Sequence, residues 1–242
     1  MANGSCVTLL ILMELMIKLY KTKYMMKKIL KKIKSNLQVI TGKLFSKRNW
    51  IKEMSYEDYI NLQLTKTKDE GRIKKWLNEE WEIKLVGFQK MFKGREIYFK
   101  DAKKALCLGA RTGQEVAALR NLGIDSIGVD LVEFPPYTIE GDIHNLPFEK
   151  EIFDFAFTNI YDHILYPEKF AQECSRVLRA NGNLLLHISL GFDPDEYSVS
   201  YTYSSTPIID IFAKYGMKIV KEGVISNDYD SMNYELVFNK TE

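Results

Sequence analysis

Two glycines and one aspartate are spaced so that they could hold a nucleotide-like ligand. Gly109 and Gly113 follow the apolar run 105–108, and Asp130 ends the next apolar run. A strand, a glycine turn, a helix and a second strand ending in an acid is the order in which open α/β sheets build such sites. Asp130 would then lie beside the glycine turn, where its carboxylate can accept hydrogen bonds from both hydroxyls of a ribose.

The spacing of the glycines excludes two other ligand classes. A dinucleotide fingerprint needs glycine at the first, third and sixth positions, which here are Gly109, Arg111 and Gln114. No Lys-Ser or Lys-Thr pair follows, so a phosphate-binding loop is also excluded. Glycine at the first and fifth positions is the pattern that remains.

Later segments extend this pattern from about Lys103 to Ile188, in a consistent order: 141–148, 153–159, 167–170 and 176–186. In content and order the whole set resembles class I S-adenosylmethionine-dependent methyltransferases of the type 11 group. The resemblance implies an α/β fold with a Rossmann-like, seven-stranded, mostly parallel sheet flanked by helices, preceded here by an N-terminal helical extension. It also implies the cofactor S-adenosyl-L-methionine and methyl transfer to an acceptor bound above the sheet.

The resemblance further implies a set of cofactor-binding residues. Asp130 is expected at the ribose hydroxyls, Asp142 at the adenine edge with Ile143 in apolar contact, and Asn159 at the methionine portion. The full predicted set is Gly109, Arg111, Gly113, Glu115, Asp130, Leu131, Asp142, Ile143 and Asn159.

Two positions depart from the family pattern. Cys107 stands where family members commonly carry an acid, and Arg111 stands where they carry the third-position glycine. Arg111 could bind the cofactor carboxylate, since a guanidinium matches carboxylate geometry, or it could be a solvated residue of the turn. An inactive or merely cofactor-binding protein therefore stays open as an alternative.

The candidate catalytic residues are His163 and Asp162, in a loop where the family often has a histidine pair. His163 could accept a proton near neutral pH, and Asp162 could raise its basicity. The alternative is a histidine packed against the following helix. His144 is expected in a turn and His187 in the core. The scattered histidines and cysteines predict no metal site.

Composition favours one domain with an extension. The chain has 242 residues, 46% of them hydrophobic, which is enough for one substantial core. The net charge of +2 divides into +10 for residues 1–50 and −8 for the rest. We therefore predict a basic, partly apolar arm (1–50) and a methyltransferase domain (51–242). The latter comprises a helical cap (51–100), a cofactor-binding core (103–190) and a closing helix with antiparallel strands (191–242).

The arm could bind an anionic membrane surface. Its apolar run 7–17 is too short to cross a bilayer, which takes about 20 residues, and it fits a signal peptide poorly. Lysines alternate with apolar residues at helical spacing over 18–34. Residues 7–34 could therefore place a methyltransferase for a lipid-like acceptor on a membrane, or they could be a solvated extension. The expected partner is a small-molecule acceptor and not a nucleic acid, and the expected location is cytoplasmic, peripherally membrane-associated in the alternative.

The remaining elements can be placed from local signals. Ser55, with Asp58 three residues later, predicts a helix start, and one long helix is expected over 72–93. Tyr59 and Lys66 could contact the cofactor as parts of a lid, although core packing and surface charge are the expected roles. Pro135-Pro136 predicts a loop between the second and third strands. Further expected elements are strands 153–158 and 183–189, helices 168–178 and 208–215, and a closing antiparallel pair, 217–225 with 233–239.

Overall fold

A computed structural model describes residues 49–226 and 232–241. The predicted arm therefore lies outside the described residues except for its last two positions, and the predicted membrane-contact segment 7–34 lies wholly outside them. Among the described residues, no helix has the length and apolar character needed to cross a membrane.

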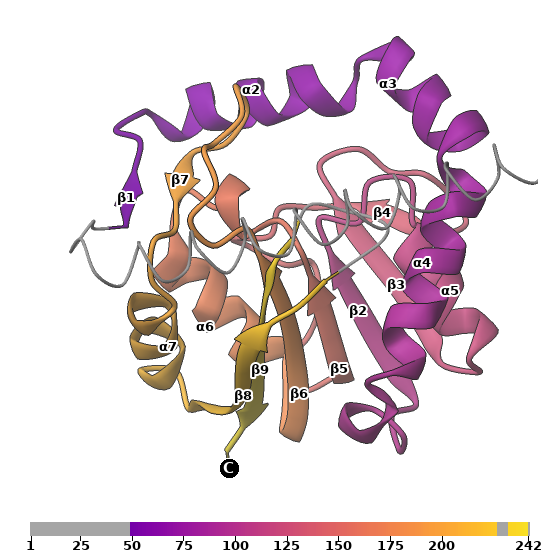
Figure 1. Ribbon diagram of the computed structural model, residues 1–242, viewed down its shortest axis with the longest axis vertical. Coiled ribbons are helices and arrows are strands. Elements are labelled where there is room, and N and C mark those ends of the chain that lie inside the picture. Colours follow the sequence, from indigo (N-terminus) through magenta and orange to yellow (C-terminus); the bar gives the residue numbers. More distant parts are fainter. Residues whose placement is uncertain (1–48, 227–231, 242) are drawn as a thin grey trace, which may run out of the picture.

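The domain is built on one seven-stranded sheet with the strand order β4-β3-β2-β5-β6-β9-β8 (Figure 1). The strands are β2 (Lys104–Leu108), β3 (Asp125–Asp130), β4 (Thr138–Glu140), β5 (Phe153–Thr158), β6 (Leu178–Ile188), β8 (Met217–Val224) and β9 (Tyr234–Lys240). Neighbours from β4 through β6 pair in parallel, whereas β9 is antiparallel to both β6 and β8. The prediction of a seven-stranded, mostly parallel α/β sheet is confirmed.

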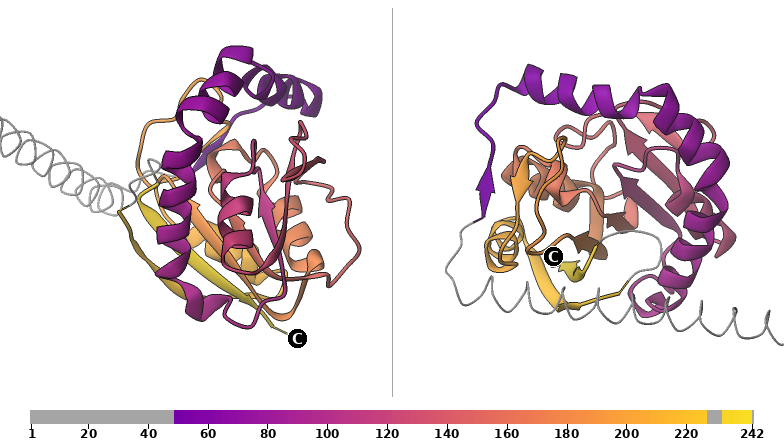
Figure 2. Two further views of the ribbon diagram at one scale, coloured as in Figure 1. Left: turned by 90° about the vertical axis from the view of Figure 1, so that its right-hand side faces the viewer. Right: turned by 45° about the horizontal axis from the view of Figure 1, so that its top comes forward.

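Helices cover both faces of the sheet because the central strands are apolar on both sides. Phe155 and Phe157 of β5 pack with Phe92 on the face that carries α4 (Trp81–Lys93) and α5 (Gln114–Asn121). Ala156 packs on the opposite face, which carries α6 (Pro167–Val177) and α7 (Thr206–Ala213). Because successive side chains of β5 pack on opposite faces, the sheet forms the middle layer of a three-layer sandwich (Figures 1 and 2).

The connection between β3 and β4 contains no helix, as predicted. Residues 131–137 form a loop that includes Pro135 and Pro136, and β4 then pairs with the last half of β3. The short crossover keeps the ends of β3 and β4 adjacent, and the N–H of Gly141 donates to the carbonyl of Asp130 at 2.8 Å. Asp130 and Asp142 are thereby brought to the same corner of the sheet.

A helical segment precedes the sheet and crosses above the carboxyl ends of its strands (Figures 1 and 2). It begins with β1 (Trp50–Ile51), which pairs with β7 (Ser200–Tyr201), and continues into α2 (Tyr56–Thr67). The hydroxyl of Ser55 accepts a hydrogen bond from the Asp58 N–H, so the predicted N-cap is confirmed.

The prediction of one helix over 72–93 is wrong. The structure has α3 (Glu70–Lys74), a π-helical turn (Lys75–Glu79) and α4 from Trp81. In the π-helical turn the N–H of Glu80 donates to the carbonyl of Lys75, five residues earlier, which shifts the helical register. Trp76 is thereby buried while its neighbour Leu77 stays 41% exposed. Apolar periodicity alone does not reveal such a shift.

Candidate active site

The turn after β2 has the left-handed backbone that its two glycines favour. Gly109 has φ +71° and Gly113 has φ +88°. A Cβ on Gly109 would lie 2.7 Å from a side-chain carbon of Ile160, so a larger residue would also collide. Arg111 lies between the glycines with φ +45°, a conformation that costs an ordinary residue about 1 to 2 kcal/mol.

Asp130 is the last residue of β3 and is 8% exposed. Its Oδ2 accepts the backbone N–H of Arg111 at 2.8 Å, and the N–H groups of Leu131 and Val132 also donate to its carboxylate. Burial raises the pKa of the Asp130 carboxyl despite these donors. A carboxylate has about four acceptor sites, so Asp130 retains capacity for one incoming hydroxyl group.

A small pocket of about 60 Å³ lies beside Asp130, beneath α2. Asp142 lines it with its carboxylate already accepting hydrogen bonds from Tyr56 and from the backbone and ring of His144. These bonds lower the pKa of Asp142, although burial acts in the opposite direction. The lining residues predicted from the sequence are Gly109, Arg111, Asp130, Leu131, Asp142, Ile143 and His163; α2 adds Tyr59, Gln63, Lys66 and Thr67.

A wider cavity of about 310 Å³ adjoins this pocket. Glu115 lines it, and burial raises the pKa of its carboxyl to about 7. The guanidinium of Arg111 lies 5.2 Å from the ring centroid of Trp76, which the sequence did not single out as a site residue. The predicted residues that line this cavity are Gly109, Arg111, Glu115, Asn159 and His163; the others include Trp76, Glu80, Lys84, Phe88, Gln114 and Met232.

His163 is engaged at both ring nitrogens. Its Nδ1 lies 3.1 Å from the Tyr197 carbonyl oxygen and its Nε2 lies 2.9 Å from Lys66 Nζ. Burial lowers the pKa of His163, and Lys66 adds to this effect. Asp162 acts in the predicted direction from 3.6 Å but is outweighed. Asp162 therefore raises the basicity of His163 as expected, but burial has the larger effect and the pKa of His163 is lowered.

Lys66 belongs to the site, and the expectation of a surface charge is wrong. It is buried in the last turn of α2, and desolvation by burial lowers its pKa to about 8. Tyr59, Gln63 and Lys66 share one face of α2 because they are spaced at i, i+4 and i+7. This spacing in the sequence could have indicated that the three residues share a face of the helix. It does not reveal which part of the protein that face contacts.

Two predicted site residues contact neither cavity. Gly113 supplies the turn before α5 and lies against Tyr137, and the carboxylate of Asp162 accepts one hydrogen bond from the Ser198 hydroxyl. His187 is fully buried, as predicted, and pairs with Glu235 at 3.0 Å. His144 is also buried and accepts the N–H of Tyr166, so it joins two segments rather than merely forming a turn.

Comparison with known proteins agrees with this architecture. Residues 106–186 match the type 11 family model described as a methyltransferase domain. No curated protein matches the sequence. Together with the motif order and the strand order, the match supports a class I S-adenosylmethionine-dependent methyltransferase domain over these residues, with S-adenosylmethionine as the cofactor.

Solved structures share the fold at low sequence identity. One is the 1,6-didemethyltoxoflavin-N1-methyltransferase of Burkholderia thailandensis, solved with 1,6-didemethyltoxoflavin and S-adenosylhomocysteine. It is 16% identical, with a TM-score of 0.60, over 79% of this chain and 92% of that one. Another is a possible histamine N-methyltransferase of Thermotoga maritima. It is 16% identical, with a TM-score of 0.55, over 75% of this chain and 100% of that one.

Proposed function

We propose that the enzyme transfers the methyl group to a small-molecule acceptor that binds in the wider cavity. The observation that carries this proposal is the boundary between the two cavities, because Gly109, Arg111 and His163 line both. A pocket for the cofactor therefore opens directly onto an internal space of about 310 Å³, the size of small-molecule sites. By name, both structural relatives above act on small molecules.

The donor set fits the cofactor. Asp130 would bind the ribose, Leu131 and Ile143 would flank the adenine, and Asp142 would accept from its amino group. The pocket of about 60 Å³ is smaller than ordinary ligand sites of about 300 to 1,000 Å³. Since α2 supplies one wall, a shift of α2 would make room for the adenosine portion.

The wider cavity would receive the methionine portion at its boundary with the smaller pocket. Arg111 offers a guanidinium for the carboxylate, and Asn159 and Glu115 lie on the same wall. When bound, S-adenosylmethionine supplies an activated methyl group on its sulfonium sulfur, and the leaving group is a neutral thioether. The chain's own tasks are then to align the acceptor and to exclude water.

Two measurements test the proposal. Calorimetric titration should show that S-adenosylhomocysteine binds at one site per chain. The enzyme is then incubated with methyl-labelled S-adenosylmethionine and an extract of its source organism, followed by separation into soluble small molecules, lipids, proteins and nucleic acids. Label among the small molecules is expected, with heat-denatured enzyme as the control. Label confined to proteins or nucleic acids would contradict the proposal, and label in lipids would favour the membrane-surface alternative.

A further inference from the structure

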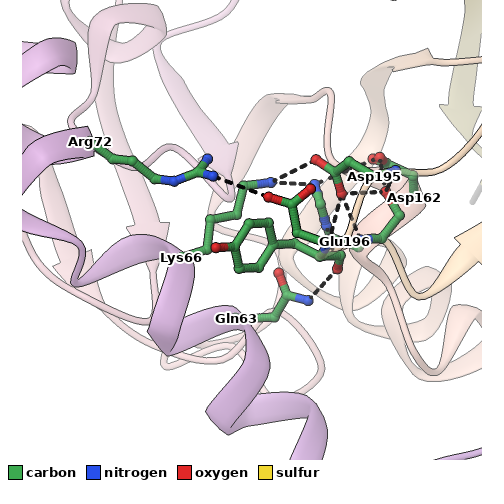
Figure 3. Close-up of polar contacts among 9 residues, drawn as sticks. Gln63, Lys66, Arg72, Asp162, Asp195 and Glu196 are labelled. Atoms are coloured by element: carbon green, nitrogen blue, oxygen red, sulfur yellow. Dashed lines mark hydrogen bonds and ion pairs between the residues drawn. The ribbon is translucent and has the colours of Figure 1, made fainter.

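Lys66 lines the smaller pocket, and its amino group points toward Asp195 (Figure 3). Its Nζ is 2.9 Å from His163 Nε2 and 3.7 Å from an oxygen of Asp195, and its side chain is 10% exposed. The ring of Tyr197 lies 5.3 Å from the same nitrogen. Because His163 lines both cavities, Lys66 Nζ is one hydrogen bond away from the place where they join.

The neighbours of His163 decide which group can receive a proton. A carbonyl oxygen can only accept, so the contact with the Tyr197 carbonyl places a hydrogen on Nδ1 of His163. In neutral His163 the lone pair is then on Nε2, which accepts a hydrogen bond from the amino group of Lys66. His163 therefore positions Lys66 through a hydrogen bond and is poorly placed to serve as the base itself.

The elements around Lys66 place both positive and negative groups near its amino group. Burial, Arg111 in the turn after β2, and Arg72 on α3 lower its pKa, whereas Asp195 after β6 and Asp162 beside His163 raise it. The balance leaves the pKa at about 8, so a substantial fraction of Lys66 is neutral slightly above pH 7. A further cation at the cavity boundary would increase the neutral fraction.

We propose that the neutral amine of Lys66 accepts the proton of the methyl acceptor, with His163 as the residue that positions it. This inference rests on the function proposed above. The X–H proton of the acceptor passes to Lys66 Nζ, which becomes an ammonium group. The X–CH3 bond forms as the S–CH3 bond breaks, and the electron pair of the broken bond stays on sulfur.

The inference narrows the class of acceptor. A group that is already ionised at neutral pH, such as a carboxylate, has no proton to transfer. Thiols and phenols ordinarily have pKa values of about 8.5 and 10, so they keep their proton near neutral pH and exchange it readily with an amine of this kind. The acceptor is therefore a group that keeps its proton near neutral pH, such as a thiol or a phenol.

The test follows the lysine side chains of the full chain by NMR after labelling with carbon-13 lysine. The Lys66 signal is assigned from its absence in Lys66→Arg, which keeps the positive charge. A lysine far from the cavities, Lys150, is the internal control. Titrations are recorded with S-adenosylhomocysteine, whose sulfur is neutral, and with sinefungin, which carries an ammonium group where the cofactor carries its sulfonium.

Lys66 should titrate near pH 8 without ligand, and its midpoint should fall further with sinefungin than with S-adenosylhomocysteine, while Lys150 stays unchanged. A Lys66 midpoint at 10 or above in the S-adenosylhomocysteine complex, or equal midpoints in the two complexes, would overturn the inference and leave the proposed function intact. Failure of both ligands to bind in the calorimeter would instead overturn the proposed function, and the inference with it.

Discussion

The backbone N–H of Arg111 donates a hydrogen bond of 2.8 Å to Oδ2 of Asp130, and so joins the glycine turn to the end of the neighbouring strand. The Asp130 carboxylate thereby has two roles: it holds the turn, and it offers its remaining acceptor site to a ligand. A substitution at Asp130 can affect both, and the choice of substitution decides which effect is seen.

Asp130→Asn should weaken the binding of S-adenosylhomocysteine about tenfold or more, because a hydrogen bond to a charged group contributes about 1.5 to 3 kcal/mol. Asparagine keeps one acceptor oxygen for the Arg111 N–H, so the melting temperature should change little. Calorimetry and thermal denaturation measure the two quantities. Asp125→Asn, at the exposed opposite end of β3, is the control. An unchanged dissociation constant would remove Asp130 from the cofactor site.

Arg111→Gly should weaken S-adenosylhomocysteine binding through loss of the guanidinium, with little loss of stability. Relief of the φ +45° conformation, about 1 to 2 kcal/mol, offsets the greater freedom of glycine in the unfolded chain. Titration of both proteins with the ligand decides the matter, and Arg111→Lys shows how much of the effect is charge alone. Tighter binding by the glycine variant would mean that the arginine side chain obstructs the cofactor.

Gly113→Ala should destabilise the fold much more than Gly123→Ala. Both glycines have similar φ values, +88° and +85°, so the backbone cost of about 1 to 2 kcal/mol is shared. A Cβ on Gly113 would lie 2.3 Å from the Tyr137 Cβ, whereas a Cβ on Gly123 meets nothing within 4 Å. Urea denaturation of the two variants isolates the steric part. Equal losses would show that Tyr137 moves away at no cost.

Glu235→Gln should destabilise the protein by about 3 kcal/mol, because it leaves the largely buried guanidinium of Arg95 without a counter-charge. Glu235 is fully buried and is paired with His187, Arg95 and Lys221. Burial raises the pKa of Glu235, but the bonds from His187 and Arg95 outweigh it and lower the pKa to about 2. The wild-type protein should therefore gain this stabilisation above the ordinary value of 4.5 and lose it as pH falls toward 2.

Urea denaturation at pH 7, 4.5 and 3 checks this prediction. The difference between wild type and Glu235→Gln should shrink as the pH falls through that range. Glu149→Gln, at an exposed position, should show no such trend. A constant difference at all three pH values would contradict the assigned pKa.

The basic arm should bind anionic vesicles if residues 7–34 act as predicted. Replacing Lys27, Lys28, Lys31 and Lys32 with glutamine in the full chain should abolish cosedimentation with phosphatidylserine vesicles, since each basic residue contributes about 1 kcal/mol near such a surface. Binding should also weaken with salt. These lysines lie outside the described residues, so the prediction rests on the sequence. Equal sedimentation of both proteins would exclude the charged mechanism.

Local signals were sufficient for much of the fold and for part of the site. The strand ending at Asp130 and the loop required by Pro135-Pro136 depend on residues close together in sequence, and both are confirmed. The π-helical turn before α4 places Trp76 against Arg111, a contact between residues far apart in sequence that apolar periodicity does not show. Lys66 could not be recognised because its partners, His163 and Asp195, lie 97 and 129 residues further along the chain.

The two ends of helix α2 are held by different interactions. At its start, the hydroxyl of Tyr56 donates a hydrogen bond to Asp142, and its ring stacks on that of Tyr166 with the ring centroids 5.5 Å apart. Beyond its far end, Arg72 pairs with Glu196 at 3.3 Å, with side chains 38% and 69% exposed. Dissolved ions screen exposed pairs strongly but leave packed rings almost untouched. Raising the ionic strength should therefore weaken the Arg72–Glu196 pair and leave the contacts of Tyr56 almost unchanged.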